Sequence, residues 1–433
     1  MEKKLEIIPN KLSGNVKVPP SKSISHRAII CAGLSQGVSK VENLIYSDDI
    51  KATIQAMKTF GMDVMMEVCQ GDRYTLTLKN DKMANINEKP IEAPATIDCH
   101  ESGSTIRFLM PFFELSSAPV TFTGRGRLVE RPYTTYYRIF DEKGIDYKTT
   151  EGLLPVTVSG DLPPGQYALE GNVSSQFITG LMLVLPLLKA NSTIDITTHL
   201  ESKGYVDLTL EALDAFGIEV ENKAYERFEI KGNQTYKATD YFVEGDYSQA
   251  AFWLVAAAIG NGVSLGGMKW ESLQGDRAIL GILERMGAKV TYDHHDIQVD
   301  VDRLKGITID ASQCPDLVPV LAVLCSLSEG TSQIINAERL RIKESDRLKA
   351  ISTELNKMGA AITETPDGLI IEGVSGFKGA QVDAWNDHRI AMAIAVASTR
   401  TEGNIELTGY DAVKKSYPMF WDDFAALGGK ING

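Results

Sequence analysis

Apolar and polar positions follow a recurring order along the chain: an amphipathic stretch with helical spacing, a glycine, and then a β-rich segment. Six copies occur, and each glycine is suited to end its helix in a left-handed conformation. The six glycines are Gly61, Gly144, Gly217, Gly287, Gly359 and Gly428. They recur at intervals of roughly 70 residues, longer than the usual solenoid repeat, so each copy is a larger supersecondary unit.

A second class of helical segment precedes each copy, and its members are apolar on nearly all sides after a polar start. These segments are 23–33, 102–110, 174–182, 247–255, 315–324 and 386–395. Helices that are apolar all round lie in the centre of a domain. Alternating strands such as 75–78 and 306–310 lie between them. The pattern predicts six units of two helices and three or four strands, three units per domain, with helices inside and sheets outside.

Length, composition and charge narrow the class of protein. A chain of 433 residues with 43% hydrophobic and 23% charged residues predicts a globular protein of two or three domains. The net charge of -13 argues against a general nucleic-acid surface. Five scattered cysteines without metal-ligand spacing indicate free thiols in a reducing compartment. Without a signal-peptide pattern or an apolar run that could span a bilayer, we expect a cytoplasmic protein.

The stretch 340–347 interleaves both signs of charge just before an amphipathic helix. Ser345 is the predicted N-cap, which places Lys343 and Glu344 at the mouth of the helix and Arg347 in its first turn. A helix N-terminus favours anions, and a carboxylate inside such a basic site is a candidate acid/base. The alternative is a solvated helix start with local salt bridges.

Basic residues recur near the polar starts of the buried helices, so several positive dipole ends could face one cleft. They are Lys22, Arg27, Arg107, Arg131, Lys343, Arg347, Arg389 and Lys415. Such a cleft would bind more than one anionic group. The alternative is that some of these residues only pair with Asp48, Asp49 or Asp346.

Six motifs follow one another along the chain: 19–28 (PPSKSISHRA), 103–107 (GSTIR), 124–132 (GRGRLVERP), 174–177 (SSQF), 343–347 (KESDR) and 386–389 (NDHR). Together they closely resemble the 5-enolpyruvylshikimate-3-phosphate (EPSP) synthase family. The resemblance implies an α/β (α+β) fold, a two-domain inside-out barrel with three βαβαββ units per domain. It implies an N-terminal domain of residues 17–242, mainly for shikimate-3-phosphate. Residues 1–16 plus 243–433 would form the C-terminal domain, with the phosphoenolpyruvate and catalytic residues.

The resemblance also implies a reaction. The enolpyruvyl group of phosphoenolpyruvate would pass to the 5-hydroxyl of shikimate-3-phosphate, with release of phosphate, in the biosynthesis of chorismate and aromatic amino acids. No metal and no organic cofactor are implied. We expect the two small molecules as partners, no nucleic acid or membrane, and a monomeric protein.

The chemistry of addition and elimination needs acid/base groups, since the acceptor hydroxyl must lose a proton and the vinyl carbon must gain one. Asp316 and Glu344 are the candidates, and Lys22 would protonate or stabilise the leaving phosphate. Guanidinium groups suit phosphate and carboxylate because they can bind both oxygens at once.

Substrate contacts are implied position by position. For shikimate-3-phosphate they are Lys22, Ser23, Arg27, Ser174, Ser175, Gln176, Ser202, Tyr205, Asp316 and Lys343. For phosphoenolpyruvate they are Lys22, Gly103, Arg131, Gln176, Arg347, Arg389 and Lys415. Glu101-Ser102 stands where some members have Asn-Ala, and Phe108 where some have Pro. These departures flank the phosphoenolpyruvate contacts and bear on inhibitor sensitivity.

Two alternatives to this resemblance remain. UDP-N-acetylglucosamine enolpyruvyl transferase shares the six-unit architecture, but it typically has Lys-Asn where Lys22-Ser23 stands. It also carries a loop cysteine in the region of 110–130, where this chain has none. A non-catalytic, two-lobed anion-binding protein is the other alternative, and Asp316 and Glu344 within a basic cluster count against it.

Overall fold

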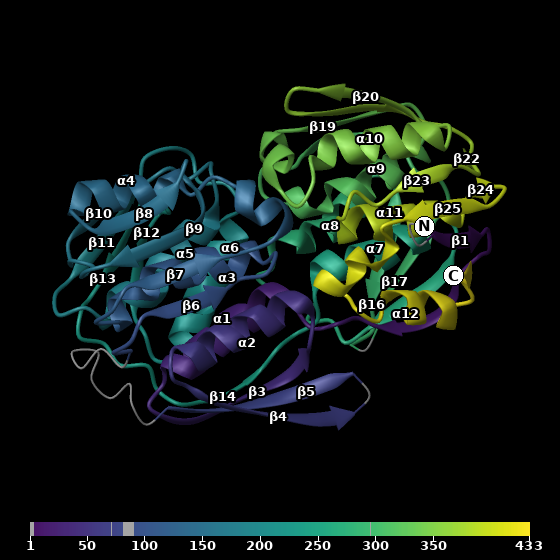
Figure 1. Ribbon diagram of the computed structural model, residues 1–433. Coiled ribbons are helices and arrows are strands. Elements are labelled where there is room, and N and C mark those ends of the chain that lie inside the picture. The colour runs from purple at the N-terminus through teal and green to yellow at the C-terminus, as the bar shows by residue number, and fades with distance from the viewer. Residues whose placement is uncertain (1–3, 71, 81–90, 295) are drawn as a thin grey trace. The chain divides into compact units, whose positions relative to one another are not determined.

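The computed structural model describes residues 4–70, 72–80, 91–294 and 296–433 (Figure 1). The chain divides into two compact units. The insert unit is Lys22–Val243, and the terminal unit combines Met1–Ser21 with Glu244–Gly433. Each unit has its own hydrophobic core and mixes helices with sheets, so the fold is of the α/β class.

Six helices in the described residues are buried along all or nearly all of their length. They are α1 (Lys22–Leu34), α3 (Gly103–Leu109) and α5 (Ser175–Val184) in the insert unit, and α7 (Tyr247–Ala258), α9 (Val318–Ser326) and α11 (His388–Ser398) in the terminal unit. All six fall within the apolar segments predicted from the sequence or overlap them closely. The prediction that these segments form buried helices is therefore confirmed.

Six further helices bury one face only, as the amphipathic stretches predict. They are α2 (Asp48–Thr59), α4 (Thr134–Lys143), α6 (Lys203–Ala215), α8 (Ala278–Arg285), α10 (Arg347–Lys357) and α12 (Phe420–Ala426). The predicted glycine follows each helix within two residues, and its φ is positive in every case, from +68° at Gly144 to +104° at Gly287. The six predicted helix terminators are confirmed.

The insert unit contains three four-stranded sheets among its described residues, and Figure 1 shows one of them beside α1 and α2. In spatial order the sheets are β14 (Asp240–Phe242), β3 (Gly37–Ile45), β5 (Arg73–Asn80) and β4 (Asp63–Gln70); β6 (Ala95–Asp98), β7 (Val120–Thr123), β9 (Leu153–Ser159) and β8 (Asp146–Thr150); and β10 (Gln166–Leu169), β11 (Ser192–Ile196), β13 (Arg227–Ile230) and β12 (Val220–Lys223). In each sheet the first pair is parallel and the other two pairs are antiparallel.

The terminal unit repeats this strand pattern three times in the part of the chain that is described. Its sheets are β2 (Ser13–Lys17), β15 (Gly262–Gly266), β17 (Asp296–Val301) and β16 (Ala288–Tyr292); β18 (Thr308–Asp310), β19 (Thr331–Ile335), β21 (Gly368–Glu372) and β20 (Ala361–Thr365); and β23 (Gln381–Asp383), β25 (Ile405–Thr408), β1 (Lys4–Ile8) and β26 (Lys430–Asn432). A short pair joins β22 (Phe377–Lys378) to β24 (Thr401–Glu402).

Alternation of side chains fixes how these short strands pair. In β9, Leu154, Val156 and Val158 are buried, and the residues between them are more exposed. Val158 lies opposite Val120 and Val156 opposite Phe122 on β7, so apolar side chains meet on one face. A shift of one residue would turn this face towards water.

The described helices also bear on the question of a membrane. None of them is both long enough and apolar enough to cross a bilayer.

Helices α3 and α5 approach each other closely at Gly180. A Cβ at this position would overlap the hydroxyl of Tyr136 and the carbonyl oxygen of Arg107. The Tyr136 hydroxyl donates to that carbonyl at 2.5 Å and to the carbonyl of Phe177 at 3.2 Å, so it links both helices. The small glycine therefore lets α3 and α5 pack closely at Arg107 and Gly180.

Replacement of Gly180 by alanine should lower the free energy of unfolding by about 1–3 kcal/mol, because an added methyl group cannot be accommodated without displacing backbone. Chemical denaturation measures this loss. Gly281 in α8 is the matched control, since nothing lies within 4 Å of its added Cβ. Gly281→Ala should instead stabilise its helix by roughly 0.5–1 kcal/mol. Equal effects of the two substitutions would contradict the close packing at Gly180.

Candidate active site

Lys22, the first residue of α1, forms an ion pair at the start of α2. Its Nζ lies 2.8 Å from Oδ2 of Asp49, and the two side chains are 17% and 11% exposed. One alternative from the sequence was that Lys22 only forms an ion pair with an acidic residue such as Asp49. The structure contains this ion pair. The ammonium group is nevertheless partly exposed at a helix N-terminus, where an anion is favoured.

Arg27 is a buried guanidinium held by hydroxyl and carbonyl oxygens. It donates from Nε to Thr209 Oγ1 at 2.9 Å, and from Nη1 to the carbonyl oxygen of Ser23 at 2.7 Å. Its Nη2 donates to the carbonyl oxygen of Tyr205 at 2.9 Å and to Thr179 Oγ1 at 3.3 Å. Burial lowers its pKa to about 10, which leaves the group charged at neutral pH. The Arg27 guanidinium therefore links α1 to α5 and α6 through its hydrogen bonds. Its role in binding substrate stays a prediction.

Gly103 lies where two guanidinium groups approach the start of α3. A Cβ here would lie 2.6 Å from Nη1 of Arg131 and 2.9 Å from Nη1 of Arg107. Arg107 donates to Oε1 of Gln176 at 2.8 Å, and Nε2 of Gln176 donates to the Ser104 hydroxyl at 2.9 Å. The structure therefore brings together three residues that the sequence assigned to phosphoenolpyruvate: Gly103, Arg131 and Gln176.

Arg107 was part of the predicted basic set but was given no substrate contact. Its guanidinium lies over the rings of Tyr133 and Phe177, at 5.7 and 5.3 Å from the ring centroids. Its side chain is mostly buried and holds the amide of Gln176 in one orientation. The signal that could have found it is its position one helical turn after Gly103.

The remaining predicted residues of the insert unit lie at the starts of α5 and α6. Ser174 caps α5, since its side chain accepts from the backbone N–H of Gln176. Ser175 is buried at 5% exposure. Ser202 precedes α6 with φ of +55°, an unusual conformation for a residue with a side chain. Tyr205 lies in the first turn of α6, and its carbonyl oxygen accepts from Arg27.

Arg347 organises the cluster in the terminal unit. Its side chain is 2% exposed, and three carboxylates surround it. Nη1 lies 2.8 Å from Oδ1 of Asp316, Nη2 lies 2.6 Å from Oε2 of Glu344, and Nε lies 2.8 Å from Oδ2 of Asp387. Burial opposes the charge, but the three carboxylates outweigh it and raise the pKa of Arg347.

The three carboxylates differ in their access to solvent. Asp387 is fully buried, and its side chain caps α11 by accepting from the backbone N–H of Arg389. Asp316 and Glu344 are 14% and 19% exposed. Asp387 therefore holds Arg347 on its buried side, while Asp316 and Glu344 remain accessible to a ligand. Sequence reasoning missed Asp387, although its place before a helical Arg389 is a typical cap signal.

The predicted N-cap of α10 was wrong. Asp346 caps the helix, with its side chain accepting from the backbone N–H of Lys349. Ser345 donates to Oδ2 of Asp387 at 3.0 Å instead. Serine and aspartate are both good N-caps. Because the Ser345 hydroxyl is used by the buried carboxylate of Asp387, Asp346 takes the cap position. Arg347 still begins the helix, as predicted.

Lys343 lies directly after the turn Glu338–Ile342, and its side chain is 33% exposed. Loss of hydration lowers the pKa of its ammonium group to about 8, with Arg347 acting in the same direction and Asp316 opposing it. Its Nζ lies 4.0 Å from Oδ1 of Asp316. This ammonium group therefore lies beside the candidate acid/base Asp316.

Arg389 and Lys415 complete the terminal cluster. Nη2 of Arg389 lies 3.3 Å from Oδ2 of Asp316, and Nη1 donates to the carbonyl oxygen of Asp316 at 3.2 Å. Nζ of Lys415 donates to the carbonyl oxygen of Asn386 at 2.7 Å. Asp316 lies in the turn before α9, Arg347 begins α10, and Arg389 lies in the first turn of α11. These three helices pack against one another, so their polar starts gather within one unit.

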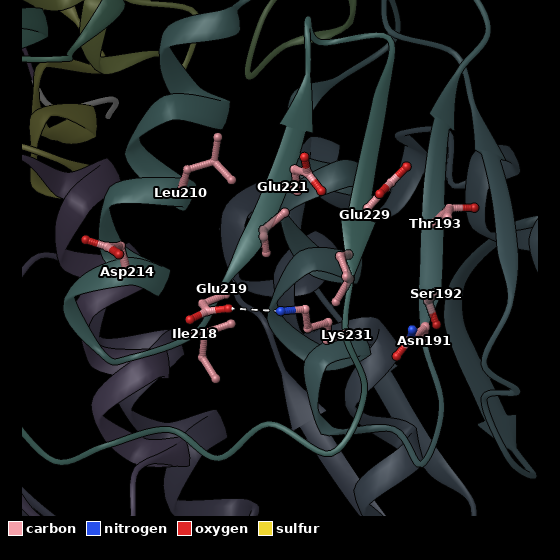
Figure 2. A pocket seen from close by; sticks show the side chains of 12 residues that line it. Asn191, Ser192, Thr193, Leu210, Asp214, Ile218, Glu219, Glu221, Glu229 and Lys231 are labelled. Carbon is pink, nitrogen blue, oxygen red and sulfur yellow. Dashed lines mark hydrogen bonds and ion pairs between the residues drawn. The ribbon is translucent and has the colours of Figure 1, made fainter.

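The insert unit also contains a cavity of about 630 Å³ (Figure 2). It lies between α6 and the sheet of β11, β12 and β13, and Lys231 forms an ion pair across it with Glu219 at 3.4 Å. Its lining includes the acidic residues Asp214, Glu221 and Glu229 and none of the predicted site residues. An acidic lining does not suit anionic substrates, so this cavity is not the candidate active site.

Comparisons with known proteins agree with the geometry. The family described as "EPSP synthase (3-phosphoshikimate 1-carboxyvinyltransferase)" matches residues 7–424. The chain belongs to the EPSP synthase family. The resemblance noted in the sequence is therefore confirmed, and the chain is an enzyme of the carboxyvinyltransferase type.

Relatives of the EPSP synthase family cover the chain almost completely. The 3-phosphoshikimate 1-carboxyvinyltransferase of Clostridium novyi is 53% identical, over 99% of this chain and 98% of its own. That of Clostridium beijerinckii is 52% identical, over 98% and 97%. A solved structure of EPSP synthase from Acinetobacter baumannii superimposes with a TM-score of 0.80 at 27% identity and covers 99% of both chains.

The described side chains offer little for a metal ion to bind. No group of three or more His, Cys, Asp or Glu residues there is arranged to hold a metal ion. The expectation that no cofactor is needed stays a prediction.

Proposed function

We propose that this enzyme transfers the enolpyruvyl group of phosphoenolpyruvate to the 5-hydroxyl of shikimate-3-phosphate. The observation that carries the proposal is the pair of partly exposed carboxylates, Asp316 and Glu344, both held by the buried guanidinium of Arg347. Membership in the EPSP synthase family supports the same reaction. Location in the cytoplasm and a monomeric state remain predictions.

Basic groups support binding of two substrates that each carry a phosphate and a carboxylate. The insert unit gathers Lys22, Arg107 and Arg131 near the starts of its buried helices. The terminal unit gathers Lys343, Arg347 and Arg389. Guanidinium and ammonium groups at helix N-termini stabilise such anions. Two sets of contacts are part of the proposal. Shikimate-3-phosphate would contact Lys22, Ser23, Arg27, Ser174, Ser175, Gln176, Ser202, Tyr205, Asp316 and Lys343. Phosphoenolpyruvate would contact Lys22, Gly103, Arg131, Gln176, Arg347, Arg389 and Lys415.

The two carboxylates would divide the proton transfers of addition and elimination. Asp316 would accept the proton of the acceptor hydroxyl, while Glu344 would donate a proton to the methylene carbon and recover it when the intermediate collapses. Lys22 would stabilise or protonate the departing phosphate. Arg347 keeps both carboxylates in place through its contacts to each.

The finer architecture also belongs to this proposal. The recurring sheets, each with a parallel pair and two antiparallel pairs, support six βαβαββ units arranged as two inside-out barrels. The compact units Lys22–Val243 and Met1–Ser21 with Glu244–Gly433 support two domains close to the expected 17–242 and 1–16 plus 243–433. Residues 17–21 group with the terminal unit and residue 243 with the insert unit, unlike in the expected division. Residues 1–3 of that second domain lie outside the described residues.

Release of inorganic phosphate tests the proposed reaction. The purified protein should release phosphate when both shikimate-3-phosphate and phosphoenolpyruvate are present, and release should stop when either is omitted. UDP-N-acetylglucosamine in place of shikimate-3-phosphate should give none. Phosphate release with that nucleotide sugar alone as acceptor would support the other enolpyruvyl transferase and contradict the proposal.

A further inference from the structure

One buried carboxyl in the terminal unit lies outside the proposed site. Asp276, in the turn Gly275–Arg277 before α8, is 3% exposed. Its Oδ2 accepts a hydrogen bond from the hydroxyl of Ser248, and its Oδ1 has no hydrogen-bond partner among the described residues. No ion pair joins it to a basic side chain in the described ranges. A carboxylate in such surroundings is costly, so the neutral form is favoured.

The surroundings of Asp276 connect it to the candidate catalytic groups. Ser248 lies in the first turn of α7, which packs against the turn that carries Asp276 and the turn Pro315–Leu317 that carries Asp316. α7 also packs against α11, which carries Arg389. The charged groups that act on Asp276 are Asp316, Arg389 and the α7 cap Asp246.

Burial, followed by repulsion from Asp316 and Asp246, raises the pKa of Asp276 to about 7, while Arg389 and Ser248 act in the opposite direction. The nearby thiol of Cys314 stays neutral in this range, because burial raises its pKa to about 12. The carboxyl of Asp276 therefore changes its charge near neutral pH.

We propose that Asp276 is a positioning residue of the transfer reaction, whose buried carboxyl acts through its charge on Asp316 and Arg389. While Asp276 is neutral, it does not oppose the attraction of Arg389 for an anionic substrate. When Asp276 ionises, its negative charge opposes the anion and weakens binding. The inference rests on the proposed function, because that function places phosphoenolpyruvate against Arg389.

The substitution Asp276→Asn tests the inference, because asparagine keeps the shape and an acceptor for Ser248 but stays neutral at every pH. The KM for phosphoenolpyruvate should be measured for both proteins from about pH 6 to about pH 8.5, either side of the titration. The ratio of wild-type KM to variant KM should be near one at the acid end. It should rise to roughly three- to tenfold at the alkaline end, as one nearby charge would cause after screening. Titration of the substrate affects both proteins equally, so it cancels in the ratio of the two KM values.

Two further variants separate a charge effect from a structural one. Ser248→Ala removes a hydrogen bond that favours the ionised carboxyl, so the rise in KM should move to higher pH. Glu354→Gln neutralises another buried carboxyl of the same unit, which contacts Lys357 and Trp385 instead. Its KM ratio to wild type should not depend on pH. A constant ratio for Asp276→Asn over the whole range would overturn the inference.

Thermal unfolding gives a measurement that needs no activity. The pKa of Asp276 is higher in the folded protein than in the unfolded chain, so the wild type loses stability as the pH rises from about 4 to about 7. The Tm of Asp276→Asn relative to wild type should therefore rise over this interval and then level off. An unchanged difference would contradict the titration, whatever the reaction is.

Failure of the inference and failure of the proposed function give different results. If the wild type releases no phosphate, the function is wrong, while the Tm comparison still decides whether Asp276 titrates. If the wild type is active and the KM ratio is flat, only the inference is wrong. If Asp276→Asn does not fold, Ser248→Ala decides, since an unmoved KM profile in that variant overturns the inference.

Discussion

Replacement of Glu344 by glutamine should lower turnover by roughly two to four orders of magnitude, the span of a positioned acid/base. The variant keeps an oxygen that can accept from Nη2 of Arg347, now 2.6 Å from Oε2, so the fold and shikimate-3-phosphate binding should be preserved. In the proposed reaction, arriving anionic substrates would favour the protonated form of Glu344, so that one residue could act as acid and then as base. Turnover and exchange of solvent deuterium into the methylene group should fall together.

Glu338 is a matched control for this substitution. It lies in the turn Glu338–Ile342 of the same segment, is exposed, and has no place in the proposed site. Glu338→Gln should keep turnover near the wild-type value. Deuterium exchange at the wild-type rate in Glu344→Gln would assign proton transfer to another residue, with Asp316 and Lys22 next in line.

Replacement of Lys22 by methionine should lower turnover on the order of a hundredfold or more, as expected for loss of a preorganised charge contact to phosphate. The structure adds a second effect. The substitution leaves Asp49, whose side chain is 11% exposed, without the ammonium group 2.8 Å away. We therefore expect a loss of about 1–3 kcal/mol in the free energy of unfolding, measured by urea denaturation.

The double variant Lys22→Met with Asp49→Asn separates the two effects. Removal of the uncompensated carboxylate should recover most of the lost stability. Turnover should stay low, because the cation is still missing. Recovery of turnover along with stability would mean that Lys22 acts only through the ion pair with Asp49.

The sequence predicted the fold well because its signals are local. Each amphipathic helix ends near a glycine, and a positive φ at Gly144 or Gly287 needs no knowledge of distant residues. The buried helices were recognisable because their apolar character extends around the whole helix. Strand pairing was less accessible, because β14 and β3 join residues about 200 positions apart in the chain.

The site was only partly predictable, because its partners depend on tertiary packing. The capping error at Ser345 arose because the deciding acceptor, Asp387, is distant in sequence. Asp387 contacts Arg347, and Arg107 contacts Gln176. Both residues hold predicted substrate contacts in place without being such contacts themselves. A resemblance that assigns substrate contacts position by position therefore does not identify them. Asp276 gave no signal, since only burial next to Ser248 distinguishes it from a surface aspartate.

Strands β1 and β2 come from the start of the chain but complete two sheets of the terminal unit, and β1 pairs with both β25 and β26. During translation the insert unit is contiguous and can fold as soon as it leaves the ribosome, whereas β1 must wait for the 190 residues of 244–433. At typical elongation rates this wait lasts roughly 10–40 s. Throughout it, β1 carries two unsatisfied edges that can pair with another chain. We therefore expect the nascent protein to be most prone to aggregation after the insert unit has folded and before the last strand is made.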